Sequence, residues 1–244
     1  MKRLFFALLI LSSTTVAAQE SVLLRVNYEA GDTYQIKMNT DISMGAAGFV
    51  NSSMMMETNI TAVENGLFKT ESKLTSIVMD MEQGGMSMQY STDMKDDELD
   101  QIGQMMKAQF EPMMKATIYT TIDKLGTTLE TRVEPNVAGM EQIADGSSNL
   151  NYPEEKVSVG STWTTEVDKD GLLMKLIYTV KSIEDGTAML DITGDVSGTG
   201  TGKVKGFTNV DLKSGVQKNS ELELTVTTQG MEVSNKINLT TTKI

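Results

Sequence analysis

The chain has 244 residues and a formal net charge of −12, and it contains neither His nor Cys. The missing side chains exclude Ser-His-Asp and Cys-His nucleophiles, zinc sites built on imidazole or thiolate, and disulfide bonds. The negative charge disfavours nucleic acid as a partner, because phosphates repel it. We therefore expect no enzyme activity, no cofactor and no metal site.

Residues 1–18 have the layout of a secretory signal peptide. Lys2 and Arg3 precede a short apolar run at residues 4–11, and small residues end the segment at 16–18. The apolar run is much shorter than the roughly 20 residues that cross a bilayer. We therefore expect an exported protein, periplasmic or secreted, that is not membrane-spanning and whose mature chain covers residues 19–244.

The mature chain has similar turns, in the same order, in a first half at about residues 19–135 and a second half at about 157–244. Gly-Asp-Thr-Tyr opens a strand-like run at Gly31, and Gly-Ser-Thr-Trp opens another at Gly160. Asn-Gly ends at Gly66 and Asp-Gly at Gly186, and both supply the positive φ of tight hairpins. A third pair of turns occupies residues 123–126 and 211–215. Two interpretations stay open: a duplication, or chance matches between short turns.

Apolar and polar side chains alternate between these turns. Leu222, Leu224 and Val226, for example, are separated by Glu and Thr. This period of two, with abundant Thr and Val, predicts about eleven or twelve antiparallel strands in a single β-rich domain. So many strands do not form one flat sheet. The fold class is therefore mainly β, as a strongly curved antiparallel sheet or an open barrel, with two pseudo-repeated halves if the duplication is real.

Residues 94–115 predict one inserted amphipathic helix. Asp96 or Asp97 would cap its start, and Pro112 would end or kink it. A shorter helical piece is predicted by the spacing of apolar residues at 137–144. The apolar stripe of the main helix consists of side chains three or four residues apart: Leu99, Ile102, Met106, Phe110 and Met113.

Nineteen methionines are present, and most lie between Met38 and Met114. Three interpretations are open: adaptable packing of a core poor in aromatics, a soft apolar cavity between sheet and helix, and a thioether site for Cu(I) around Gly84 and Gly85. Met79 and Met81 fall on the same face as Ile77, which favours packing over copper. On the cavity interpretation, the candidate ligand-binding residues are Met79, Met81, Leu99, Ile102, Met106, Phe110 and Met113.

Two segments resemble a known family. Tyr152-Pro153 leads into Val-Ser-Val-Gly-Ser-Thr-Trp at residues 157–163, after the early Gly-Asp-Thr-Tyr strand. In these features the chain resembles a family of exported bacterial proteins of unknown function, and it departs from the pattern at Ser161, where an acid is common. The resemblance implies no activity. A looser architectural analogy links the chain to periplasmic lipoprotein-carrier folds, in which a curved sheet encloses an apolar cavity.

These observations predict an exported, non-catalytic protein that binds a hydrophobic ligand or lipid in a Met-rich cavity. The alternative is a structural or protein-interaction module of the cell envelope with a filled core. The two differ in whether the apolar face of the inserted helix borders a void or is packed to normal interior density.

Overall fold

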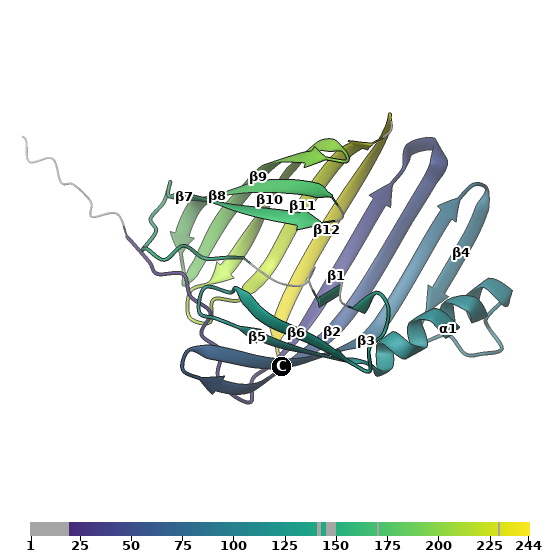
Figure 1. Cartoon of the computed structure of the whole chain (residues 1–244), viewed down its shortest axis with the longest axis horizontal. Helices are drawn as coiled ribbons and strands as arrows, with labels where there is room; N and C mark the ends of the chain where they lie inside the picture. The colour runs from purple at the N-terminus through teal and green to yellow at the C-terminus, as the bar shows by residue number, and fades with distance from the viewer. Residues whose placement is uncertain (1–19, 141–142, 145–149, 170, 229) are drawn as a thin grey trace, which may run out of the picture.

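A computed structural model describes residues 20–140, 143–144, 150–169, 171–228 and 230–244, so the predicted signal peptide lies outside the described residues. Its named elements form one antiparallel sheet with the α-helix α1 and the short 3-10 helix η1 (Figure 1). The elements are β1 (Thr33–Ser43), η1 (Gly45–Ala47), β2 (Gly48–Glu64), β3 (Leu67–Gln83), β4 (Met86–Ser91), α1 (Gln101–Lys115), β5 (Thr117–Ile122), β6 (Thr128–Glu134), β7 (Thr162–Lys169), β8 (Leu172–Glu184), β9 (Thr187–Gly198), β10 (Thr201–Asp211), β11 (Gln217–Thr228) and β12 (Met231–Lys243).

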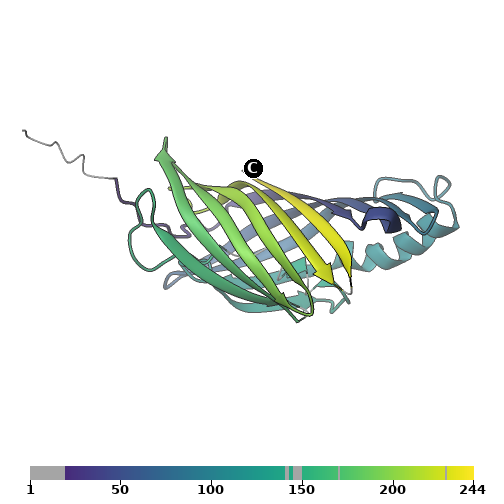
Figure 2. The same cartoon turned by 90° about the horizontal axis from the view of Figure 1, so that it is seen from above.

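The strands form one continuous, strongly curved sheet that does not close. Their order is β6-β5-β3-β2-β1-β12-β11-β10-β9-β8-β7, and β4 pairs with the far end of β3. Seen from above in Figure 2, the sheet curls into a trough, with β6 and β7 at its two ends. The prediction of a mainly β chain with a curved, open antiparallel sheet is confirmed.

The two halves are built alike. In the order of the sheet, β1, β2, β3, β5 and β6 correspond to β7, β8, β9, β10 and β11. The hairpins after β2 and β8 have the same turn, with Asn65 and Gly66 at φ 53° and 78°, and Asp185 and Gly186 at φ 49° and 71°. Two consecutive residues at positive φ define the type I′ turn that Asn-Gly and Asp-Gly predict.

Hydrogen bonds repeat between the halves as well. The amide of Gly31 donates to the carbonyl of Ile60, and the amide of Gly160 donates to that of Val180, both at 2.8 Å. Immediately after Ile60 and after Val180, the strand register shifts by one residue at a β-bulge. Matching turns, bonds and bulges favour the duplication over chance. They also make Ile60 and Val180 equivalent positions.

Two features break the symmetry of the repeat. The strand β12 joins β11 of the second half to β1 of the first, so the two halves form one sheet. The pair β4 and α1 is inserted between β3 and β5, whereas β9 and β10 are connected directly by a tight turn.

The inserted helix is shorter than predicted. It spans Gln101–Lys115 rather than 94–115, because the carboxylate of Asp100 caps it by accepting a hydrogen bond from the amide of Gly103 at 2.7 Å. The prediction that Asp96 or Asp97 forms the cap was therefore wrong. Pro112 does not end the helix, which continues to Lys115. The shorter predicted piece is confirmed at Met140, 143 and 144, which have helical backbone.

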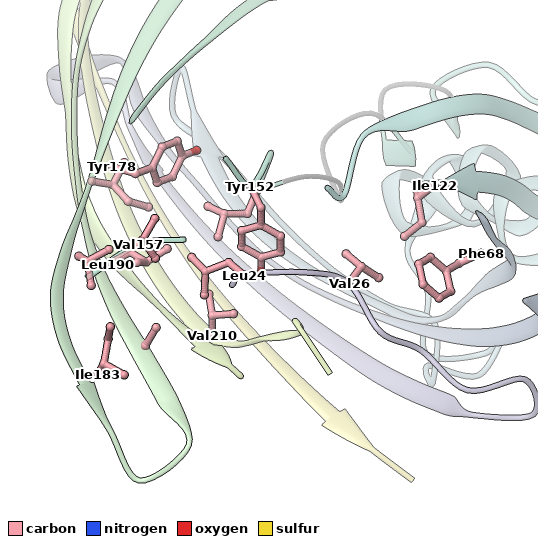
Figure 3. Packing of buried hydrophobic residues seen from close by; sticks show 14 residues of the cluster. Leu24, Val26, Phe68, Ile122, Tyr152, Val157, Tyr178, Ile183, Leu190 and Val210 are labelled. Atoms are coloured by element: carbon pink, nitrogen blue, oxygen red, sulfur yellow. The ribbon is translucent and has the colours of Figure 1, made fainter. Parts of the chain in front are cut away.

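An N-terminal strap, residues 20–32, crosses the trough and connects both halves (Figure 3). The amide of Val26 donates to the carbonyl of Lys124 at 2.9 Å, and the next amide, of Asn27, donates to that of Ser214 at 2.8 Å. Lys124 and Ser214 belong to the third pair of matching turns. Adjacent strap residues therefore bind equivalent turns of the two halves.

The strap also contributes to the largest of the four buried hydrophobic clusters found among the described residues. Leu24 and Val26 pack there with Tyr152 and Val210, and Figure 3 shows Leu24 between the last two. The second core lies where α1 packs on β3 and β4, and the rings of Tyr90 and Phe110 approach to 5.5 Å.

Candidate functional site

The concave face carries a band of apolar side chains in the middle of the sheet, interrupted by Thr40, Ser52, Ser220 and Asn235. In an antiparallel sheet, directly opposed residues point to the same side, so the strand register assigns each side chain to a face. Met38 of β1 lies opposite Met54 of β2 and Leu239 of β12. The apolar residues that share this face in the middle of the sheet and are only half-buried are Ile36, Met38, Ile42, Val50, Met54, Leu222, Leu224, Val233, Ile237 and Leu239.

The opposite, convex face carries charges. Lys181 pairs with Asp191 across neighbouring strands at 3.1 Å, and Lys236 pairs with Glu221 at 3.1 Å. These pairs are exposed, so each contributes little to stability. The two faces of the sheet therefore differ in polarity.

The structure places most of the predicted helix residues in the core. Leu99, Phe110 and Met113 are 8%, 8% and 7% exposed, and Met106 packs against the same cluster. Ile102, in contrast, is 36% exposed on the outer side of the helix. The structure therefore packs most of the predicted stripe into one buried cluster, and Ile102 lies at the edge of that cluster.

The two predicted strand methionines lie on the concave face. Met79 is opposite Tyr90 of β4 and packs against the core beneath α1. Met81 is opposite Met88 and is half-buried further along the hairpin. These assignments agree with the predicted alternation, in which Ile77, Met79 and Met81 share one face. Whether they contact a ligand stays a prediction.

Enclosed space beside the Met-rich strands is small. A cavity of about 20 Å³ is bordered by Met54, Met56 and Leu74, which is room for roughly one water molecule. A larger hollow of about 300 Å³ touches Leu99 at the start of α1, but most of its lining is polar, including Gln89 and Glu98. A bulky apolar ligand would therefore lie on the open concave surface or displace side chains.

A further cavity of about 100 Å³ lies under the strap. Tyr34 and Tyr152 line it together with Ile36 and Leu239, which also border the small Met-lined cavity. The hydroxyl of Tyr152 donates to the carbonyl of Gly215 at 2.8 Å, and burial raises the pKa of this tyrosine well above its usual value. This cavity therefore shares Ile36 and Leu239 with the apolar part of the concave face.

This cavity is next to a polar hollow of about 230 Å³ that Tyr34 also lines. There the ammonium of Lys243 contacts the carboxylate of Asp32 at 2.7 Å. A hydrogen bond from Lys243 lowers the pKa of Asp32 despite its partial burial. The end of the concave face near Asp32 and Lys243 is therefore charged, and its middle is apolar.

A separate apolar surface occupies the upper part of the second half. Val196, Val204 and Val226 are buried there, and five partly buried side chains pack around them: Leu172, Met174, Leu176, Leu222 and Leu224. The sequence pattern identifies the alternation of residues 222–226, but the predicted site did not include it. The repeat could have identified this surface, because it makes residues 172–176 of β8 equivalent to the Met-rich part of β2.

Within the described residues, no helix is long and apolar enough to cross a lipid bilayer. In the same part of the chain, no three carboxylates come close enough together to hold a metal ion.

Comparison with solved structures finds a similar fold. The chain resembles lipovitellin, in a structure titled "Lipid-protein interactions in lipovitellin", with a TM-score of 0.62 and 10% sequence identity. The match covers 89% of this chain and 25% of the lipovitellin chain, so this chain spans about a quarter of the length of that protein. At this identity the likeness concerns the fold alone.

Comparison of sequences gives one family. No curated protein is significantly similar to the chain. Residues 140–243 match the model of a family of unknown function, DUF6263, and this region includes the Val-x-Val-Gly-x-Thr-Trp segment of the predicted resemblance, whereas the early Gly-Asp-Thr-Tyr segment lies outside it. The predicted resemblance to an uncharacterised family is confirmed: the second half of this chain is similar to DUF6263.

Proposed function

We propose that the protein is exported and binds a hydrophobic ligand or lipid on the concave face of its sheet, without catalysis. The observation that carries this proposal is the continuous apolar surface from Met38 and Met54 across Leu239 and Ile237 to Leu222, whose side chains are only half-buried. Leaving such area in water costs about 25 cal/mol per Å², which a bound apolar ligand recovers.

Two further observations support a lipid as the ligand. Methionine side chains are unbranched and polarisable, so Met38 and Met54 can repack around acyl chains of different shape. The fold is also similar to lipovitellin, a protein whose structure was described for its lipid contacts. Likeness of fold alone is an analogy and does not identify the ligand.

The alternative function is a structural or protein-interaction module of the cell envelope. The burial of Leu99, Phe110 and Met113 favours it, because the inserted helix packs against the sheet as in an ordinary core. On this alternative, the concave face either contacts a protein partner or holds only water.

Native mass spectrometry of the full chain, purified without detergent after expression in an exporting host, tests the proposal. We expect additional mass that organic extraction removes. Ile237→Asp places a charge on the concave face and should abolish this mass, whereas Asn238→Asp, on the convex face of the same strand, should retain it. Circular dichroism would establish that both variants are folded. A protein without additional mass, before and after incubation with phosphatidylglycerol vesicles and stearate, would contradict the proposal.

A further inference from the structure

The two halves differ in what covers their concave faces. In the first half, the inserted α1 packs on β3 and β4, and its Phe110 and Met113 are buried there. In the second half, β9 continues directly into β10, so no inserted helix is present at the equivalent place. Within the described residues, the repeat therefore contains one site covered by an inserted helix and one equivalent site without such a helix.

The register of the repeat identifies the equivalent residues. Because Ile60 corresponds to Val180, Met56 corresponds to Leu176 and Met54 to Met174. Met56 and Met54 belong to the core that α1 completes. Among the described residues, the cluster around Leu176 and Met174 contains members of β8, β9, β10 and β11 only, and its Leu176 and Leu222 also pack at the edge of the core that includes Leu24.

The surface formed by this cluster is apolar in its described members, and its three valines are buried. We define it as the second-half surface, formed by the concave side chains of the cluster: Leu172, Met174, Leu176, Val196, Val204, Leu222, Leu224 and Val226. All eight are aliphatic or thioether side chains. A head group with a phosphate or carboxylate would find no partner among them, so the surface suits the hydrocarbon part of a ligand.

The surface also curves sharply. Gly194, Gly202 and Gly206 point to the concave side, and a Cβ atom added to them would lie 2.6, 2.0 and 2.0 Å from a backbone carbonyl oxygen of the neighbouring strand. Glycines at these positions allow the strands to approach closely and the sheet to bend. A helix with its side chains is about 10 Å wide, and a single acyl chain is much thinner.

We propose that the second-half surface holds the acyl chain of the lipid, in the position that α1 occupies in the first half. This inference rests on the proposed function and deepens it, because it names an aliphatic chain as the ligand part and the second half as its location. The candidate residues on α1 then serve as a permanent internal cover, and the contact residues are Met174, Leu176 and Leu224.

Fluorescence quenching by dibromostearate tests this location, because bromine quenches tryptophan only at short range. One protein would carry Trp163→Phe and Leu176→Trp, and a matched protein would carry Trp163→Phe and Met81→Trp, which places the indole on the concave face of the first half. We expect at least threefold stronger quenching at position 176. Leu224→Trp in the same background provides a second reporter if Leu176→Trp does not fold.

The outcomes separate this inference from the proposed function. Equal quenching at both positions, or stronger quenching at position 81, would overturn the second-half location and leave lipid binding intact. If the unsubstituted protein binds no dibromostearate and carries no extractable lipid in native mass spectrometry, the proposed function fails and the inference fails with it.

Discussion

The strap should be part of the core rather than a loose arm, and two neighbouring leucines test this. Leu24 is 1% exposed between the two halves, whereas Leu23 is 45% exposed. Truncating a buried leucine to alanine removes its transfer free energy and leaves a cavity, at a cost of about 3 kcal/mol within a range of roughly 2–5 kcal/mol. For a domain of this size, about 3 kcal/mol lowers Tm by roughly 6–12 °C.

We therefore expect Leu24→Ala to lower the free energy of unfolding by about 3 kcal/mol and Leu23→Ala by less than about 0.5 kcal/mol. Urea titration followed by circular dichroism measures both, and an unchanged m-value would establish that the same cooperative unit unfolds. Equal effects of the two substitutions, or a loss below about 1 kcal/mol for Leu24→Ala, would refute a core role for the strap.

Three further predictions concern the helix and two titrating groups. Phe110→Ala should destabilise the protein by about 3–5 kcal/mol in urea titration and Ile102→Ala by about 1 kcal/mol, and similar losses would contradict the packing described for α1. Burial raises the pKa of Tyr152 in the folded state, so the stabilisation from its neutral hydroxyl is complete below pH 10 and is lost as pH rises further. Tyr152→Phe should therefore flatten the fall of Tm above pH 10, and an unchanged slope would contradict this. The pKa of Asp32 is lowered, chiefly by its hydrogen bond from Lys243, so the ionised carboxylate stabilises the fold above the ordinary carboxyl pKa and this stabilisation is lost on acidification. Lys243→Ala should therefore reduce the dependence of Tm on pH below 4. Identical acid titrations of the two proteins would refute this prediction.

The sheet could be predicted from the sequence because its signals are local. Asn65-Gly66 and Asp185-Gly186 specify their turns through the positive φ that these residues tolerate. Alternation likewise assigns Leu222 and Leu224 to one face without knowledge of their neighbours. The number of strands and the curved, open form follow from these short-range patterns.

The helix start and the candidate site depended on longer-range contacts. Asp96, Asp97 and Asp100 are all acceptable caps by residue type, and the structure uses Asp100 because burial of Leu99 and Gly103 fixes where the helix begins. The stripe around Phe110 predicts an apolar helix face, but periodicity does not distinguish a face that is packed from one that borders a void. The role of the strap was not predicted, because its partners Lys124 and Ser214 are distant in sequence.

The pairing of β1 with β12 has a consequence for how the chain folds. The earliest strand of the sheet can pair with β2 early, but its second partner is the latest strand, so closing this contact carries a large loop-entropy cost and should come late. Until then, Ile36 and Met38 lie on a strand with one bare edge, which invites pairing with other chains. On the proposed export, a chain that crosses the membrane unfolded would meet this hazard until it folds. We therefore expect a holding chaperone to raise the yield of monomer more than it raises the folding rate.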